Sequence, residues 1–333
     1  MLNRKSLVAS LVAGLMLPAS LFAADVEYPK LSLKMSTTVG EQSNAAQMAQ
    51  AYADAVKEAS DGRIKIRVFP SDQLSGGNMS KGVEMIRSGA IDLAYEPVDV
   101  MAVLDQRLLA LSIPWAFDNY QAAEDSLLGE GGDFIKAALR EQGIEALGFI
   151  HNGFRQLTNS KREIRTPADL KAMKLRVPGG DVFVNFFRVF GADPVAMSFS
   201  ELFTALQQGT VDGQENGFDL ITANKFYEVQ PYITAWNYSY GSFALVFNKK
   251  TWDGFDENTQ ALLQEKAMEI NAMGNQRVVE GEAEKREFLT EYGVKITDLT
   301  PEELQAFKDM LGEYYTGVKA TYGEEATSAL GIK

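Results

Sequence analysis

An unusually long helical pattern runs from about Asp256 to Tyr292, and it limits the fold more than any other feature of the sequence. Gly274 and Gly281 weaken this pattern, but no proline interrupts it. At 1.5 Å per residue, such a helix spans roughly 50 Å, which is longer than one small domain is wide. We therefore expect the helix to bridge two domains.

The first third of the chain alternates between strand and helix patterns. Apolar residues alternate with polar ones in the segments expected to be strands, which are 31–35, 64–69 and 91–96. Helical patterns separate these segments and end at Gly62 and Gly89, which are typical stop signals. This order predicts an α/β fold with a mainly parallel sheet and helices on both of its faces.

The second half of the sequence repeats this arrangement. Thr166, Pro167 and Asp169 form a typical helix start, and a strand from Lys174 to Val177 follows. The later expected elements are a helix with apolar Phe183, Phe187 and Phe190, a helix ending at Gly209, a strand at 242–250 and a last helix from Thr300. Aromatic residues at helical spacing favour a place in the core, so we assign these phenylalanines no ligand role.

The first 24 residues have the pattern of a secretory signal peptide. Arg4 and Lys5 precede an uncharged run from Ser6 to Phe22, and Ala23–Ala24 offers small residues for cleavage. A proline and small residues near the end of the run disfavour the alternative, an uncleaved membrane anchor. No later stretch is long and apolar enough to cross a bilayer as a helix. We expect a protein exported to the periplasm and not inserted in the membrane.

The composition excludes several kinds of chemistry. The chain has no cysteine, which excludes disulfides, thiolate zinc sites and cysteine nucleophiles, and it has one histidine, His151. We expect His151 to be a packed structural residue, because it follows an apolar strand pattern. The formal net charge of −13 disfavours nucleic acid and anionic lipid as partners. We expect no metal or cofactor.

Arg176 lies in the stretch KLRVPGG, where Leu175 and Val177 alternate with Lys174 and Arg176. Alternation of this kind puts the two apolar residues on one face of a strand and the two cations on the other. Charges on such strands are usually solvated, so the local pattern favours a solvent-facing Arg176 over one that binds an anion. Ligands of two-domain α/β proteins bind in a cleft where strands end. The residues thus predict an exported cleft binder.

Four longer stretches resemble the solute-binding proteins of TRAP transporters, the tripartite ATP-independent periplasmic transporters (DctP family). They are GRIKIRVFPSDQL at 62–74, GFRQLTNSKREIRTPADLKAMKLRVPGG at 153–180, MSFSELFTALQQGTVDGQEN at 197–216 and KFYEVQPYI at 225–233. The resemblance implies a two-lobed clamshell with hinge strands and a long helix spanning both lobes. It places lobe I at 25–152 plus 242–281 and lobe II at 153–241 plus 282–333.

The resemblance also implies three residues that bind a ligand carboxylate. Arg176 is similar to the family's anchoring arginine, whose planar fork matches two carboxylate oxygens. Arg155 is similar to a second arginine that supports the same carboxylate, and the alternative is a salt bridge in the hinge region. Asn216 is similar to an amide that bonds the carboxylate end. Glu215 and Asp212 are expected to offset arginine charge and not to touch the ligand.

Further residues are expected at the cleft with less specific roles. Glu96 matches a glutamate of the sialic-acid receptors and would repel a second ligand carboxylate. Phe199 is expected to be an apolar wall, and Trp115 and Tyr95 are aromatic candidates for either the cleft or the core.

Three positions differ from the sialic-acid receptors. Ser36, Gly77 and Gly179 stand where those receptors have polar contacts to the larger sugar, and we keep Ser36 as a candidate contact. Sialic acid itself is therefore not the expected ligand.

The expected function is binding, without catalysis, of a carboxylated small molecule for a TRAP-type transporter with small and large membrane subunits. A hydroxylated monocarboxylate, such as a uronic or other sugar acid, is favoured over a C4-dicarboxylate or a 2-oxo acid. A ligand-presenting sensor subunit, a periplasmic enzyme acting on sugar acids and a binding protein of an ATP-driven importer are the remaining alternatives. We expect a monomer.

Overall fold

A computed structural model describes residues 27–331, so the expected signal peptide lies outside the described residues. The strands form one nine-stranded sheet in the order β2-β1-β3-β8-β4-β7-β5-β6, with β9 paired to β8. The strands are β1 (Leu31–Thr37), β2 (Ile64–Phe69), β3 (Leu93–Pro97), β4 (Ile144–Asn159), β5 (Lys174–Val177), β6 (Asp193–Ala196), β7 (Gly213–Asn216), β8 (Tyr232–Asn248) and β9 (Lys295–Asp298).

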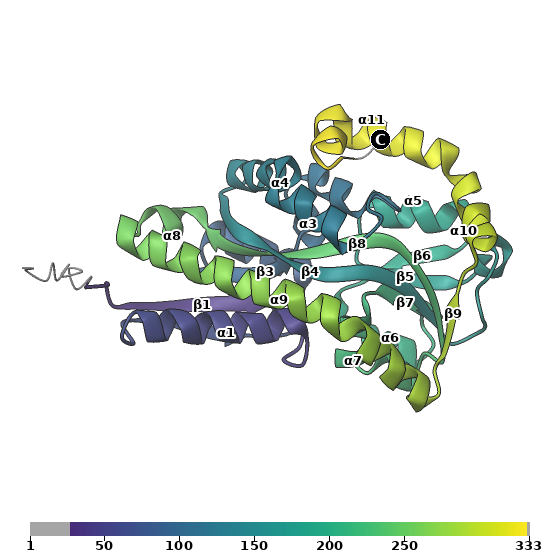
Figure 1. The fold of residues 1–333 in the computed structure, drawn as a ribbon, viewed down its shortest axis with the longest axis horizontal. Coiled ribbons are helices and arrows are strands. Elements are labelled where there is room, and N and C mark those ends of the chain that lie inside the picture. Colours follow the sequence, from purple (N-terminus) through teal and green to yellow (C-terminus); the bar gives the residue numbers. More distant parts are fainter. Residues whose placement is uncertain (1–26, 332–333) are drawn as a thin grey trace, which may run out of the picture.

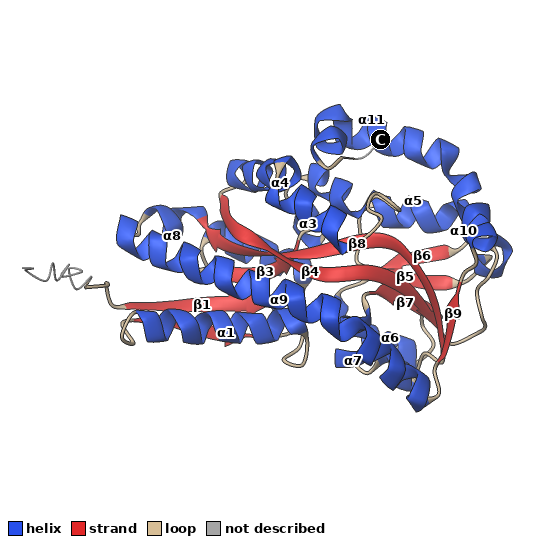
Figure 2. Cartoon of the chain, viewed as in Figure 1, coloured by secondary structure: helices blue, strands red, loops and turns tan. Residues whose placement is uncertain are grey.

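Helices flank the sheet on both sides, as expected for an α/β fold (Figure 2). They are α1 (Asn44–Ala59), α2 (Met79–Ser88), α3 (Tyr120–Leu128), α4 (Glu130–Glu141), α5 (Asp181–Val189), α6 (Phe199–Gln207), α7 (Phe218–Ala223), α8 (Lys249–Asp253), α9 (Glu257–Tyr292), α10 (Pro301–Lys308) and α11 (Gly312–Ala329). Short 3₁₀ helices are η1 (Gln73–Ser75), η2 (Val100–Val103), η3 (Gln106–Ser112), η4 (Pro167–Leu170), η5 (Phe226–Glu228) and η6 (Asp309–Leu311). In the described part of the chain, none of these helices has the length and apolar character needed to span a bilayer.

Each half of the sheet is parallel, as the sequence predicts. In one half β1 pairs parallel with both β2 and β3, and in the other β5 pairs parallel with both β6 and β7. The halves are joined by β4 and β8, which are 16 and 17 residues long and antiparallel to each other. The expected strand at 242–250 is the end of β8, and the length of this strand pair was not expected.

The long helix α9 begins and ends as the sequence predicts. The Asp256 side chain accepts a hydrogen bond from the Thr259 N–H at its start, and Gly293 ends it with a φ of 103°. It has 36 residues and runs from the β1 half of the sheet to β9 (Figure 1). The prediction of a helix that crosses both halves is therefore confirmed.

Gly274 lets α9 approach its neighbours closely. A Cβ atom at this position would lie 2.9 Å from Cγ of Met48 in α1 and 3.2 Å from Cγ2 of Ile150 in β4. These distances are shorter than normal carbon contacts, so a larger side chain would push α9 away from the sheet. The glycine that weakens the helix pattern is thus required by packing.

The C-terminal helices lie over both halves of the molecule. Helix α11 contacts η3 and α4, which precede β4 in the chain, and also α5 of the second half. The expected lobe II segment at 282–333 therefore also covers elements of expected lobe I. The division of the chain into two lobes remains a prediction.

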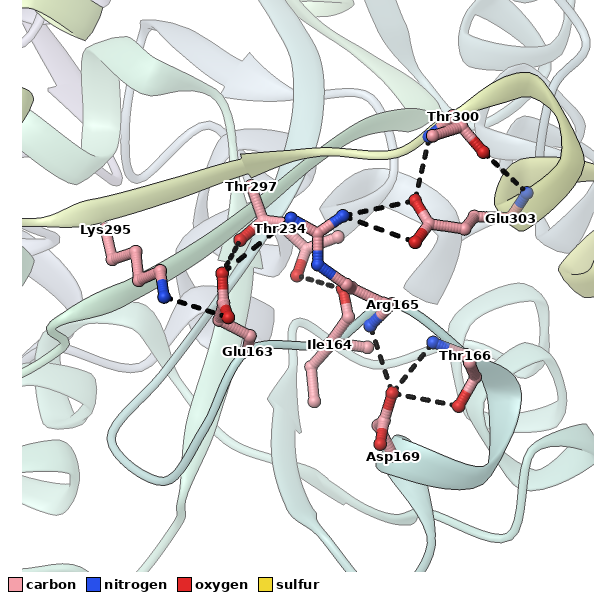
Figure 3. Close-up of polar contacts among 10 residues, drawn as sticks. All are labelled: Glu163, Ile164, Arg165, Thr166, Asp169, Thr234, Lys295, Thr297, Thr300 and Glu303. Atoms are coloured by element: carbon pink, nitrogen blue, oxygen red, sulfur yellow. Dashed lines mark hydrogen bonds and ion pairs between the residues drawn. The ribbon is translucent and has the colours of Figure 1, made fainter.

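The loop after β4 is fastened to β9 and to the start of α10 (Figure 3). The Glu163 carboxylate accepts a hydrogen bond of 2.9 Å from the Thr297 hydroxyl and pairs with the Lys295 ammonium at 2.9 Å. Arg165 pairs with Glu303 at 3.2 Å. Such contacts fix the direction in which the chain enters β5.

The helix start expected at Thr166 produces only the single turn η4. The capping contacts are present, because the Asp169 carboxylate accepts the Thr166 N–H at 2.8 Å and the Arg165 N–H at 3.1 Å. The turn ends by Ala172, which has a φ of 59°. A left-handed residue of this kind cannot continue an α-helix.

Candidate functional site

One cavity lies where parallel strands of both halves end. On one side its walls come from the chain just after β1, the end of β3, α2 and η2, and on the other side from the end of β5, α6, the end of β7 and α7. The strands β4 and β8 complete the cavity. The lining residues are Thr38, Val39, Met79, Pro97, Asp99, Val100, Asn152, Arg155, Arg176, Pro178, Phe199, Asn216, Leu220 and Phe243. The cavity is narrow, because only about 20 Å³ of it can hold the centre of a water molecule, and its volume reaches about 300 Å³ only when the adjoining open solvent is counted. This is where open α/β sheets bind ligands.

Arg176 is the cation of this cavity that has no carboxylate partner. Its side chain is 1% exposed, and its Nε and Nη2 atoms donate to the Met197 carbonyl at 3.0 and 2.8 Å. Among the described residues no acidic group forms an ion pair with it. Burial lowers its pKa to about 10, which shows that its surroundings only partly offset the loss of water. The expectation of a solvent-facing side chain from the strand pattern alone is wrong.

The ring of Phe199 lies beside this guanidinium. The Arg176 Cζ atom is 5.7 Å from the ring centroid, within the range of a cation–π contact. Phe199 also lines the cavity, so the structure places both of these predicted residues together.

Arg155 lines the same cavity but has its own counter-charge. Its Nη2 atom donates to Glu215 Oε1 at 2.8 Å, its Nε atom bonds Oε2 of the same carboxylate, and the Tyr238 hydroxyl donates to that oxygen at 2.6 Å. Burial opposes the charge of Arg155, but Glu215 and Asp99 outweigh it and raise its pKa. The expectation that Glu215 offsets arginine charge is confirmed, and the salt bridge that we considered for Arg155 is present.

Asn216 is held at the end of β7, next to Arg155. Its backbone pairs with Gln156 of β4, and its Nδ2 atom donates to Gln214 Oε1 at 2.6 Å. The side chain is buried and lines the cavity. The amide is therefore oriented before any ligand binds. Asp212, two residues before Gln214, accepts the Lys174 N–H at 2.9 Å and takes no part in the cavity wall.

Glu96 lies behind the cavity wall, and Thr38 stands between them. The Thr38 hydroxyl donates to Glu96 Oε1 at 2.6 Å, and Glu96 Oε2 is buried with no partner in the described part of the chain. Burial and the neighbouring Asp72 raise the pKa of Glu96 well above its usual value. Asp72 is also buried, its carboxylate oxygens have no hydrogen-bond partner among the residues that the structure describes, and burial raises its pKa to about 7. Direct contact between Glu96 and a ligand is not supported by this position.

Three other predicted residues lie away from the cavity. Tyr95 alternates with Glu96 on β3, so it points to the opposite face, where its hydroxyl bonds Asn271. Trp115 packs edge-on against Phe186 and Trp236, with ring centroids 5.7 and 6.1 Å apart. Ser36 is buried within β1 between β2 and β3. Tyr95 belongs to the core, whereas Trp115 is partly exposed and packs against the edge of the core.

The structure adds three polar residues that the sequence analysis did not select, namely Thr38, Asp99 and Asn152. Asp99 lies three residues after Glu96, beyond the end of β3, so it reaches the cavity where Glu96 does not. Asn152 lies at an irregularity of β4, because the register with β8 shifts between His151 and Gly153. No sequence pattern of β4 indicated this bulge.

His151 is a packed residue, as expected. Its Nδ1 atom and the Tyr240 hydroxyl form a hydrogen bond of 2.5 Å, and burial lowers its pKa to about 4. The imidazole is therefore neutral at pH 7. Among residues 27–331, acidic and histidine side chains form no group of three or more that could hold a metal ion.

The chain matches known proteins over most of its length. Residues 35–321 match the model of the bacterial extracellular solute-binding protein family 7, DctP. The 2,3-diketo-L-gulonate-binding periplasmic protein YiaO of Escherichia coli (strain K12) is 33% identical over 265 residues, which are 79% of each chain.

Two solved structures share the fold. The sugar acid binding protein DctPAm from Advenella mimigardefordensis, in complex with galactonate, has a TM-score of 0.87 at 29% identity and covers 91% of this chain and 97% of that one. A TRAP periplasmic solute binding protein from Shewanella oneidensis with bound succinate has a TM-score of 0.85 at 27% identity and covers 91% and 98%.

These matches confirm the resemblance of the sequence motifs and the fold expected from it. Proteins of this family are receptors that bind small organic acids for membrane TRAP components and are not enzymes. The chain belongs to the DctP family of bacterial extracellular solute-binding proteins, the binding proteins of TRAP transporters.

Proposed function

We propose that this protein captures a hydroxylated monocarboxylate, such as a uronic or other sugar acid, in the periplasm and delivers it to a TRAP-type secondary transporter. One observation carries the proposal: Arg176 is a buried guanidinium in the cavity and forms no ion pair among the described residues. Burying such a cation is costly unless an anion compensates it, and a planar carboxylate fits its two parallel donors.

The cavity walls support a mechanism of closure around the ligand. Arg176 and Asn216 come from strands of one half of the sheet, whereas Thr38 and Asp99 follow strands of the other half. A ligand that touches both sets stabilises the closed arrangement more than an open one. The closed, loaded protein then docks onto the membrane subunits.

Replacement of Arg176 tests the proposal. Arg176→Met removes the charge but keeps most of the side-chain volume, and it leaves the ligand carboxylate buried without a partner, at a cost of about 3–5 kcal/mol. This corresponds to about two to four decades in Kd. Arg176→Lys keeps the charge and loses the paired geometry, so we expect it to bind weakly too.

The measurement is isothermal titration calorimetry of the purified protein with galactonate, galacturonate and succinate. Arg188→Met is the matched control, because Arg188 is an exposed arginine on α5. Near-native carboxylate binding by Arg176→Met would refute the proposal. Binding of succinate without binding of either sugar acid would favour the alternative ligand class, a C4-dicarboxylate.

Transport is tested separately in cells. Deletion of the gene should abolish uptake of the bound acid if the protein serves a transporter. Loss of a transcriptional response with uptake intact would instead indicate a sensor subunit.

A further inference from the structure

Asp99 is the acidic residue that faces the cavity together with the two arginines. It lies after β3 at the start of η2, and it lines both the cavity that contains Arg176 and the larger adjoining opening formed with Pro178 and Gly179. Within residues 27–331, its carboxylate forms no ion pair and no hydrogen bond with another side chain. Burial and the Glu215 charge raise its pKa, and Arg155, its own backbone N–H and Arg176 oppose this effect. Its oxygens are therefore available as acceptors inside the cavity.

Asn152 provides a second polar group, whose Oδ1 atom has no hydrogen-bond partner among residues 27–331. Its side chain is 5% exposed and lines the cavity, and this oxygen is buried. The bulge between His151 and Gly153 sets its position, and bulges often re-aim a side chain at a binding site. An amide can donate or accept, and a hydroxyl can do both, so a ligand hydroxyl suits either orientation of this group.

The ion pairing around the cavity leaves one arginine for one ligand carboxylate. Glu215 neutralises Arg155, so Arg176 remains for the ligand. Asp99 then lies on the wall that is formed by the other half of the sheet, and Glu96 stands behind Thr38 on the same side. A second carboxylate on the ligand would approach these acids at short range, where like charges repel strongly in a buried site.

We infer that Asp99 and Asn152 determine the ligand specificity: the Asp99 carboxylate accepts hydrogen bonds from ligand hydroxyls, the Asn152 amide donates to them or accepts from them, and Asp99 excludes ligands with a second carboxylate. The inference rests on the proposed function, since it assumes that Arg176 holds the first carboxylate. It assigns to Asp99 the discrimination against dicarboxylates that the sequence analysis assigned to Glu96.

Calorimetry with three probes tests the inference. The probes are galactonate, hexanoate, which is a six-carbon monocarboxylate without hydroxyls, and succinate. For Asp99→Asn we expect galactonate affinity to fall by about tenfold and succinate affinity to rise by about tenfold or more, because one repulsive charge is removed. For Asn152→Leu we expect a loss of about tenfold for galactonate and no loss for hexanoate.

Controls keep the outcomes separate. Asp118→Asn changes an exposed aspartate outside the cavity and should leave all three affinities unchanged. Asp99→Ser serves as a second variant if Asp99→Asn melts well below the wild type without ligand.

Each outcome decides between the two proposals. If Arg176→Met loses galactonate while the Asp99 and Asn152 variants keep wild-type affinities, the inference is overturned and the proposed function stands. If the wild type binds no sugar acid, the proposed function and the hydroxyl contacts both fail, and the succinate measurements still decide whether Asp99 excludes a second carboxylate. Unchanged succinate binding in both Asp99 variants overturns it, and increased binding supports it.

Discussion

Replacement of Glu215 would remove the only counter-charge paired with Arg155 among the described residues. The ion pair is buried, with side-chain exposures of 3% for Arg155 and 0% for Glu215, and the Tyr238 hydroxyl also donates to it. Removing one partner of a buried pair costs about 3–5 kcal/mol, because it leaves a buried charge uncompensated. Total stabilities of proteins are about 5–15 kcal/mol, so Glu215→Gln removes a large share.

The assay is urea unfolding of the ligand-free protein, followed by circular dichroism. We expect the unfolding midpoint of Glu215→Gln to fall while the dependence on urea stays the same. At roughly 2 °C per kcal/mol for a chain of this size, the melting temperature should fall by about 6–10 °C.

Two controls test whether the loss of stability comes from a buried unpaired charge and not from the loss of any ion pair. Asp298→Asn breaks the exposed pair of Asp298 with Arg286, in which the aspartate is 68% exposed, and it should cost less than about 1 kcal/mol. Arg155→Met combined with Glu215→Leu removes both charges and should recover much of the loss. A Glu215→Gln variant as stable as Asp298→Asn, or a double variant no better than the single one, would refute this reasoning.

Two further predictions concern pH and the contact between α1 and α7. Asp72 ionises near pH 4 when unfolded, whereas burial raises its pKa to about 7 in the folded protein. Between pH 4 and pH 7, Asp72 is therefore protonated in the folded protein and ionised in the unfolded one. The contribution of this group to stability falls as pH rises through this range. In thermal melts, Asp72→Asn should be more stable relative to wild type at pH 8 than at pH 5, and an equal difference at both would contradict this. Asp219 of α7 accepts the Asn44 N–H at 2.9 Å at the start of α1, so its carboxylate joins elements on either side of the cavity. Asp219→Asn should weaken this helix-terminus contact by about 0.5–1 kcal/mol and speed galactonate release two- to fivefold in stopped-flow measurements, and an unchanged release rate would argue against it.

Local signals in the sequence were sufficient for the elements whose ends are set by short-range chemistry. Asp256 and Gly293 mark the two ends of α9, and both act through contacts within a few residues. The lengths of β4 and β8 could not be predicted in this way. Nearly every residue of these strands is buried, so the alternation of apolar and polar residues that indicates a strand is absent.

In the candidate site too, local sequence patterns predicted some features and missed those that depend on tertiary structure. Alternation within KLRV correctly placed Leu175 and Val177 in the core but predicted that the Arg176 side chain faces solvent. Leu175, Arg176 and Val177 point alternately to the two faces of the sheet, yet all three are buried, and only the family resemblance indicated a role for Arg176 inside the protein. The choice between Glu96 and Asp99 depends on where β3 ends and how the chain turns after Pro97, which no local pattern specifies.

The irregular pairing of β4 with β8 has a mechanical consequence. Within the sheet, these two strands are the connection between the halves, and their register shifts three times between Ala146 and Leu157. Regular ladder bonds are already interrupted there, so a twist between the halves meets its least resistance at these points. Asn152 stands at the middle shift, so the ligand contact that we propose for its amide would restrict twisting of the sheet at this point.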